Sequence, residues 1–280
     1  MVLLNIQRPA AAHDIVIFDV DGVLVDTSRS FYEVIVEALR WAWTVPLGRQ
    51  NADSSFSKEH FTLTKTHPAF NDDYDIAWAA ACCAAANDRE SLAESLPSPE
   101  EWRSLLDGCS NMDVPSWVRR SFGEHVDRET VHRVCDELYF GAETRLEGRV
   151  LPTPRTGLQS NERPLISMHW NSLPVPSGIY TGRSRRELVP ALERIGWQDF
   201  PPRMIITADL GITKPSPLGL SLLCEAAGAS NPLFLGDTES DRKALRSFGR
   251  GVFALIGALL PDEPISFSSP EEALMHHRII

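Results

Sequence analysis

The hydrophobic positions of this chain follow two different periodicities. From Asp14 to Asp21 the run DIVIFDVD is β-branched and almost continuously apolar, which is typical of a strand buried on both faces of a parallel sheet. After Ser177 short apolar runs (GIYTG, RMIITAD, PLFLGD and GVFALIG) alternate with segments of helical pattern. This alternation predicts an α/β fold with a doubly wound parallel sheet.

The segment between these regions has helical periodicity and few strand-like runs. Apolar residues recur at helical spacing from Phe31 to Ala42, and an Ala-rich stretch and further capped segments follow. The stretch GRVLPTPRTGLQSNERP, rich in turn formers, is typical of a returning linker. We therefore expect an α/β core of residues 1–27 and 161–280, with an inserted all-helical domain of residues 28–160.

Composition and charge narrow the classes of function. The 280 residues are 43% hydrophobic and 23% charged, as in a globular protein. The formal net charge of −11 repels a phosphate backbone, so we expect no nucleic-acid partner. No stretch of 18 uncharged apolar residues occurs and the start lacks a signal-peptide pattern, so we expect no membrane association. The five cysteines lack CxxC spacing, which favours a reducing, cytoplasmic location.

Polar residues stand where the predicted strands end. In an open parallel sheet ligands bind beyond the carboxyl ends of the strands, so these residues are expected to meet at one edge. They are Asp19 and Asp21 after the first strand, Thr181 after GIYTG, Lys214 downstream of RMIITAD, and Asp237 and Asp241 after PLFLGD. Four carboxylates so close need a cation or a raised pKa, and hard oxygen ligands that leave room for water and phosphate favour Mg²⁺.

The residue types then suggest a reaction. Asp19 can attack phosphorus as a nucleophile, and Asp21 can protonate the leaving oxygen and later deprotonate water. Thr181 and the following amide of Gly182 can bind phosphoryl oxygens, while Lys214 neutralises charge. Each residue also has an ordinary explanation: turn formation for the aspartates, a loop lysine, a local hydrogen bond, or a helix-start carboxylate at Asp241. Their combination favours the site.

The motifs FDVDGVLVDT, IYTGR, TKPSP and LGDTESD resemble the four ordered motifs of the haloacid dehalogenase (HAD) superfamily, mostly magnesium-dependent phosphohydrolases. The resemblance implies Asp19 as nucleophile, Asp21 as acid/base and backbone-carbonyl metal ligand, and Asp237 and Asp241 as metal-site carboxylates. It also implies a HAD-like Rossmannoid core with a helical C1-type cap, as in subfamily I. NDDYD, VDTSRSF and NERPLIS are similar to an uncharacterised phosphatase-like group.

The helical insert offers further candidates for substrate binding. Asn71 and Asp73 follow Pro68 and Phe70 and precede the Ala-rich helix, so they can face the hydroxyls or amine of a substrate. A solvated helix face or an N-cap is the more common explanation for such residues. The histidines show no metal-ligand spacing, and we expect them to be exposed or in the core.

These observations lead to a function hypothesis with open alternatives. We expect a cytoplasmic, Mg²⁺-dependent phosphatase of a small phosphorylated metabolite, acting through an aspartyl phosphate. A phosphomutase would use the same core and return the phosphoryl group to a sugar. A dehalogenase is disfavoured, because halide displacement does not need the acid/base that Asp21 supplies. A catalytically silent binding or regulatory module is the alternative from another class.

Overall fold

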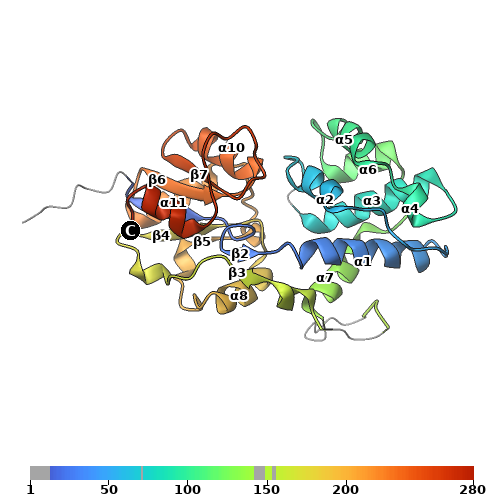
Figure 1. Cartoon of the computed structure of the whole chain (residues 1–280), viewed down its shortest axis with the longest axis horizontal. Coiled ribbons are helices and arrows are strands. Elements are labelled where there is room, and N and C mark those ends of the chain that lie inside the picture. The colour runs from blue at the N-terminus through green and yellow to red at the C-terminus, as the bar shows by residue number, and fades with distance from the viewer. Residues whose placement is uncertain (1–12, 71, 142–148, 153–155) are drawn as a thin grey trace, which may run out of the picture. The chain divides into compact units, whose positions relative to one another are not determined.

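The computed structural model describes residues 13–70, 72–141, 149–152 and 156–280. The chain divides into two compact units (Figure 1). The sheet unit comprises Met1–Leu24, Leu165–Asp237 and Asp241–Ile280. The helical unit comprises Val25–Pro164 with Thr238–Ser240. Each unit is described by itself.

The sheet unit contains a six-stranded sheet in which every strand pairing is parallel. Across the sheet the strands are β5 (Ile205–Ile206), β4 (Ser177–Tyr180), β1 (Ile15–Phe18), β6 (Pro232–Gly236), β7 (Val252–Ile256) and β8 (Ser266–Phe267). The predicted α/β class with a parallel sheet is confirmed. The pair of residues that forms β8 was not expected as a strand.

The central strand explains why the sheet forms where it does. β1 pairs with β4 on one side and with β6 on the other, and its four residues are completely buried. A strand with no solvated face needs apolar side chains on both faces, which is the continuous pattern of IVIF. Full burial of one such side chain contributes roughly 1.5–3 kcal/mol of transfer free energy.

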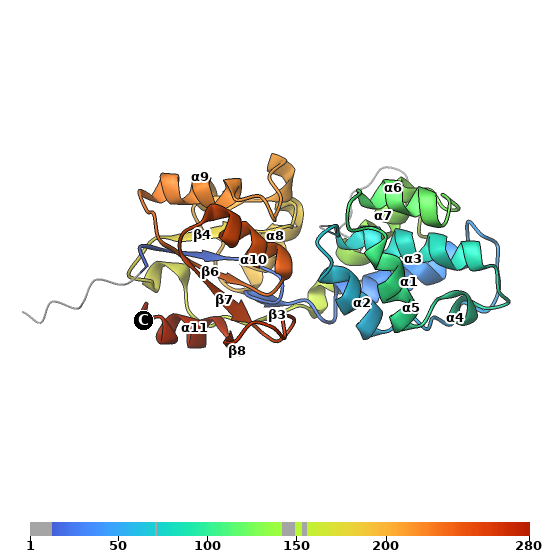
Figure 2. The same ribbon diagram turned by 90° about the horizontal axis from the view of Figure 1, so that it is seen from above.

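Four α-helices belong largely to the sheet unit and surround the sheet (Figure 2). They are α8 (Arg185–Arg194), α9 (Leu218–Ala227), α10 (Glu239–Phe248) and α11 (Pro270–His276). Ser184 and Glu187 form the predicted capping box of α8. Gly228, with φ of 67°, ends α9 in the left-handed conformation that suits glycine.

The helical unit is built around α1, α3 and α7, which contact one another. Its helices are α1 (Phe31–Thr44), α2 (Lys58–Lys65), α3 (Asp73–Asn87), α4 (Leu92–Ser95), α5 (Pro99–Asp107), α6 (Val114–Ser121) and α7 (Arg128–Phe140). α3 is buried on nearly all sides, since its alanines let neighbouring helices approach closely. Trp43, Trp78, Trp102 and Trp117 fill the core around it, each at most 1% exposed.

The two ends of the helical unit are joined to each other. β2 (Val25–Asp26) pairs with β3 (Arg163–Pro164) as a short antiparallel ladder. The buried Glu162 accepts hydrogen bonds from the hydroxyls of Ser30, at 3.1 Å, and Tyr139, at 2.8 Å. The segments by which the chain enters and leaves this unit therefore pair as a two-stranded sheet. The turn-rich sequence of the linker did not indicate this pairing.

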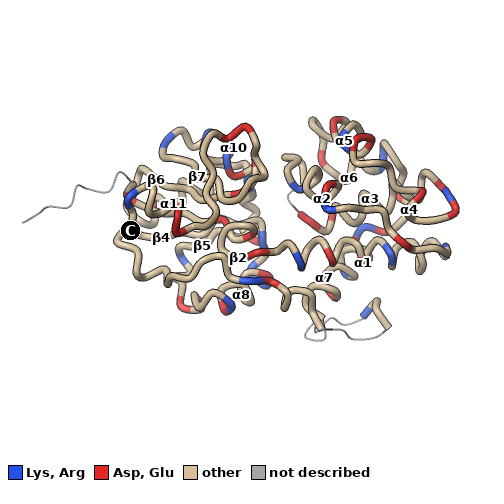
Figure 3. Tube along the Cα trace, viewed as in Figure 1, with Lys and Arg blue, Asp and Glu red and all other residues tan. Residues whose placement is uncertain are grey.

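Among the described residues, charges of both signs occur along each unit. Figure 3 shows Lys and Arg residues scattered among Asp and Glu residues along both. Within the described part of the chain, no helix combines the length and the apolar character that a bilayer crossing needs.

Candidate active site

The carboxyl ends of the central strands carry three of the predicted polar residues. Asp19 follows β1, and its N–H donates to the carbonyl of Leu235 on β6 at 2.9 Å. Thr181 follows β4, and its N–H donates to the carbonyl of Ile206 on β5 at 3.0 Å. Asp237 follows β6. Because these strands are parallel neighbours, the three side chains start from the same edge of the sheet.

A buried ammonium group joins two of the predicted carboxylates. Nζ of Lys214 lies 2.8 Å from Oδ1 of Asp19 and 2.7 Å from Oδ1 of Asp241. All three residues are at most 7% exposed. Burial alone would lower the pKa of Lys214, but the two carboxylates outweigh it and raise that pKa. Lys214 therefore places a fixed positive charge between Asp19, at the end of β1, and Asp241, near the start of α10.

Three carboxylates form the acidic group, defined as Asp19, Asp237 and Asp241. One carboxylate oxygen from each lies within 4.8 Å of the others, and all three residues are buried. Gly22 permits this approach: a Cβ there would overlap the Asp237 carboxylate, and its φ of 69° is unfavourable for other residues. Hard oxygen donors at this spacing suit a divalent cation such as Mg²⁺.

The buried surroundings of Asp19 make its charged form less favourable than in water. Burial disfavours the charged carboxylate and raises the pKa of Asp19 to about 7, although Lys214 opposes this shift. The negative charges of Asp241 and Asp21 raise the pKa further. One ammonium thus does not compensate the carboxylates around it, and a divalent cation would supply the missing positive charge.

Thr181 is held in an orientation that leaves a donor available. The N–H of Arg183 donates to Oγ1 of Thr181 at 3.1 Å. Because the oxygen accepts this bond, the hydroxyl hydrogen of Thr181 can donate to a bound oxyanion. Gly182, the neighbouring predicted residue, is exposed at the surface. The pair therefore combines a fixed hydroxyl with an accessible backbone segment.

Asp21 is bound by an arginine to which the sequence analysis assigned no role. Nε and Nη2 of Arg183 each lie 2.7 Å from Oδ1 of Asp21. Arg183 belongs to the IYTGR segment, two residues after Thr181. A basic residue so close in sequence to a strand end was the available signal, but nothing in the linear pattern indicated its partner.

Comparisons with known proteins identify the fold. No protein-family model and no curated protein sequence matches the chain. Phosphatase Tt82 from Thermococcus thioreducens is 23% identical with a TM-score of 0.62, over 93% of this chain and 98% of that one. An X-ray structure from a structural genomics consortium is 16% identical with a TM-score of 0.56, over 95% of this chain and 94% of that one. The chain shares the overall α/β fold of these two structures.

The residues of the insert that were expected to contact substrate belong to the helical unit. Asn71 lies outside the described residues. Asp73 begins α3 and forms an ion pair with Lys65, whose Nζ is 3.1 Å from Oδ2. Their side chains are 15% and 14% exposed, and the Lys65 ammonium also lies 5.5 Å from the ring centre of Phe31. Asp73 is thus an ordered, paired carboxylate, and its contact with substrate stays a prediction.

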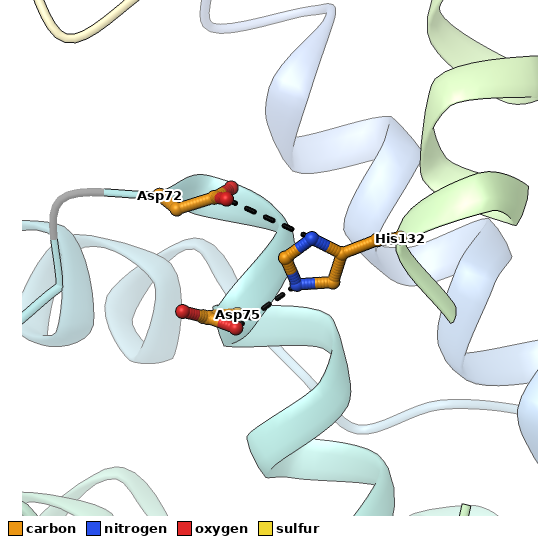
Figure 4. Close-up of side chains that lie close together, drawn as sticks. All are labelled: Asp72, Asp75 and His132. Atoms are coloured by element: carbon orange, nitrogen blue, oxygen red, sulfur yellow. Dashed lines mark hydrogen bonds and ion pairs between the residues drawn. The ribbon is translucent and has the colours of Figure 1, made fainter. Parts of the chain in front are cut away.

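A second polar cluster, in the helical unit, was not predicted. Figure 4 shows His132 of α7 between Asp72 and Asp75 at the start of α3. Nε2 of His132 lies 2.9 Å from Oδ1 of Asp75, and Nδ1 lies 3.7 Å from Oδ2 of Asp72. Arg128 contacts both oxygens of Asp75, at 2.6 and 2.9 Å. Through Asp75, Arg128 and His132 connect α7 to the start of α3.

Proposed function

We propose that the chain is a cytoplasmic, Mg²⁺-dependent phosphohydrolase of small phosphomonoesters that acts through an aspartyl phosphate. The observation that carries this proposal is the buried Asp19, which Lys214 contacts and which shares the acidic group with Asp237 and Asp241. The structural similarity to a protein named as a phosphatase supports the same chemistry. The five cysteines are free and buried, which supports a reducing location.

The acidic group fits a magnesium ion by its chemistry. Asp19, Asp237 and Asp241 offer carboxylate oxygens within 4.8 Å of one another, and the family resemblance adds the backbone carbonyl of Asp21. Mg²⁺ prefers hard oxygen ligands and is usually bound by few carboxylates together with substrate phosphate. When bound, it would reduce the repulsion between these carboxylates and a phosphate dianion.

In the first proposed step, a carboxylate oxygen of Asp19 attacks the phosphorus atom and the bond from phosphorus to the ester oxygen breaks. Asp21 donates its proton to the departing oxygen, so the product leaves as a neutral alcohol. The phosphoryl group is then attached to Asp19 as a mixed anhydride. One difficult displacement is thereby divided into two easier ones.

In the second proposed step, water attacks the same phosphorus atom and gives its proton to Asp21. The bond from phosphorus to Asp19 breaks, so the Asp19 carboxylate is restored and inorganic phosphate is released. Throughout, Lys214 would offset the negative charge that accumulates on Asp19 and the phosphoryl oxygens, while Thr181 and the amide of Gly182 would donate hydrogen bonds to those oxygens. Atoms, charge and protons balance over the cycle.

The helical unit is proposed to act as a cap that selects the substrate. The residues of the acidic group and Lys214 would recognise only a phosphoryl group and a metal ion, so another part of the chain must contact the leaving group. We assign residues 28–160 to this cap, with Asn71 and Asp73 as candidate contacts. A protein site that forms hydrogen bonds with its substrate binds an analogue less well if that analogue leaves a polar group of the protein unpaired.

A panel of phosphorylated metabolites tests the proposal. Release of inorganic phosphate is measured for sugar phosphates and amino-alcohol phosphates, with Mg²⁺ and with EDTA. We expect hydrolysis of at least one ester that EDTA abolishes and excess Mg²⁺ restores. The Asp19→Asn variant is the matched control, because the amide keeps the shape of the side chain and removes the nucleophile.

The same panel separates hydrolysis from the alternative reactions. Full activity in metal-free buffer would contradict the metal-dependent mechanism. Transfer of the phosphoryl group to a sugar hydroxyl with a bisphosphate primer, without release of phosphate, would identify a phosphomutase. A complete lack of turnover across the panel in the presence of Mg²⁺ would favour a binding or regulatory module.

A further inference from the structure

The pair formed by Asp21 and Arg183 is asymmetric in its exposure. The Arg183 side chain is 1% exposed, whereas that of Asp21 retains 16% of its surface. Two guanidinium nitrogens approach one carboxylate oxygen, each at 2.7 Å. An incoming molecule can therefore touch Asp21, while Arg183 lies behind it. Such a charge-assisted contact fixes an orientation more strictly than a contact between neutral groups.

Arg183 is itself anchored at several points. Its N–H donates to Oγ1 of Thr181, and its carbonyl accepts from the N–H of Ala208 at 3.0 Å. Nη1 donates to the carbonyl of Glu187, in the first turn of α8, at 2.9 Å. The backbone and the guanidinium are thus both fixed to the scaffold. An arginine fixed by these contacts restricts the movement of the side chain that it binds.

We propose that Arg183 is a positioning residue that holds the carboxyl group of Asp21 at the point of proton transfer to the ester oxygen. This inference rests on the proposed function and concerns the orientation of the Asp21 carboxyl group. The aspartate side chain has two rotatable bonds, and proton transfer requires the donor within hydrogen-bond distance of the leaving oxygen. A small displacement of a catalytic group can reduce the rate by about 100-fold.

The consequence depends on the leaving group of the ester. An alkyl alcohol is a poor leaving group and needs a proton as the bond breaks, whereas p-nitrophenolate leaves without one. Loss of the Arg183 contact should therefore slow the hydrolysis of alkyl esters selectively. A purely structural role would slow all esters by the same factor, because the nucleophile and the metal site would be affected together.

The experiment measures kcat/KM of the full chain with Mg²⁺ for an alkyl phosphate, phenyl phosphate and p-nitrophenyl phosphate. For Arg183→Met we expect a loss of about tenfold to 100-fold on the alkyl ester and less than about threefold on p-nitrophenyl phosphate. Asp21→Asn should show the same direction of leaving-group dependence. Arg185→Met is the matched control, since Arg185 is exposed in the same segment and should leave all three values unchanged.

Arg183→Lys provides a second variant if Arg183→Met fails to fold, as judged by circular dichroism. Lysine keeps the charge but lacks the planar fork, so we expect a smaller loss with the same leaving-group dependence. Equal losses on all esters, or no loss, would overturn the positioning role while leaving the proposed function intact. If the wild-type chain hydrolyses none of the esters, the proposed function fails and this inference fails with it.

Discussion

Nζ of Lys214 lies 2.8 Å from Oδ1 of Asp19, and the two side chains are only 7% and 6% exposed. A buried ion pair of this kind costs desolvation energy for both partners, so the loss of one partner is more harmful than the loss of both. Asp241 contacts the same ammonium at 2.7 Å, so loss of Lys214 would leave two buried carboxylates without their cation. Lys214 is therefore a structural requirement of the acidic group as well as a proposed participant in the reaction.

Lys214→Met should destabilise the chain strongly in EDTA, by about 3–5 kcal/mol, because two buried carboxylates lose their shared cation. Added Mg²⁺ should recover part of this loss, since it can compensate the same charges. Thermal unfolding with and without Mg²⁺ measures both effects. The exposed Lys58→Met is the control. A variant as stable as the wild type in EDTA would contradict the electrostatic role of Lys214.

Gly22→Ala should weaken Mg²⁺ binding, because the new Cβ would overlap the carboxylate of Asp237. We expect the Mg²⁺ concentration for half-maximal activity to rise by about tenfold or more, which corresponds to roughly 1.4 kcal/mol. Gly48→Ala is a matched control: Gly48 also has a positive φ, of 64°, but a Cβ there would meet nothing within 4 Å. If Gly22→Ala binds Mg²⁺ as well as Gly48→Ala and the wild type, the close approach of Gly22 to Asp237 does not control Mg²⁺ binding.

The stability of the helical unit should depend on pH through Asp75. Burial alone would raise its pKa, but hydrogen bonds from His132 and Arg128 outweigh it and lower the pKa below its usual value of 3.8. A pKa that is lower in the folded state stabilises the fold above the unfolded pKa, and this contribution disappears as pH falls through the folded value. The wild type should therefore lose this stabilisation below about pH 4.

Asp75→Asn tests this dependence. At pH 7 we expect a loss of about 1–3 kcal/mol relative to the wild type, because Arg128 and His132 lose a charged acceptor. The difference should shrink below about pH 4, where the wild-type carboxylate becomes protonated. Tryptophan fluorescence during unfolding reports mainly on the helical unit, whose core contains Trp43, Trp78, Trp102 and Trp117. The exposed Glu129→Gln serves as control. A difference that is constant between pH 7 and pH 2 would exclude the proposed titration.

Asp73→Ala should change substrate selectivity if Asp73 contacts the leaving group. We expect kcat/KM for the natural ester to fall by about tenfold or more, and hydrolysis of p-nitrophenyl phosphate to change much less. Lys65→Met removes the partner of the same ion pair and distinguishes a substrate contact from a packing role. Equal losses on both esters for Asp73→Ala, with the fold intact, would show that the ion pair is structural.

The α/β class, and the edge of the sheet at which the candidate site residues lie, were predictable from sequence for a clear reason. A strand buried on both faces requires a continuous apolar run, and IVIF is such a run. The residues directly after such strands must lie at the carboxyl edge, so Asp19, Thr181 and Asp237 could be placed together without coordinates. The helix ends marked by Ser184 and Gly228 followed from equally local rules.

The features that sequence reasoning missed depend on contacts between distant segments. His132 and Asp75 meet because α7 packs against α3, and no periodicity within either helix specifies the partner. The contact between Arg183 and Asp21 likewise joins two strand ends. The ladder of β2 and β3 is only two residue pairs long, too short for any strand pattern to appear. Each case requires the tertiary arrangement.

The central claim is that Asp19 becomes phosphorylated. The most direct measurement is acid quenching of the Asp21→Asn variant during reaction with p-nitrophenyl phosphate and Mg²⁺, followed by mass spectrometry of the peptide that contains Asp19. This variant keeps the nucleophile but lacks the base that would speed hydrolysis of the intermediate. We predict that the peptide gains the mass of one phosphoryl group, located on Asp19, while Asp19→Asn gains none. Turnover by Asp19→Asn, or a phosphoryl group on another residue, would contradict the account.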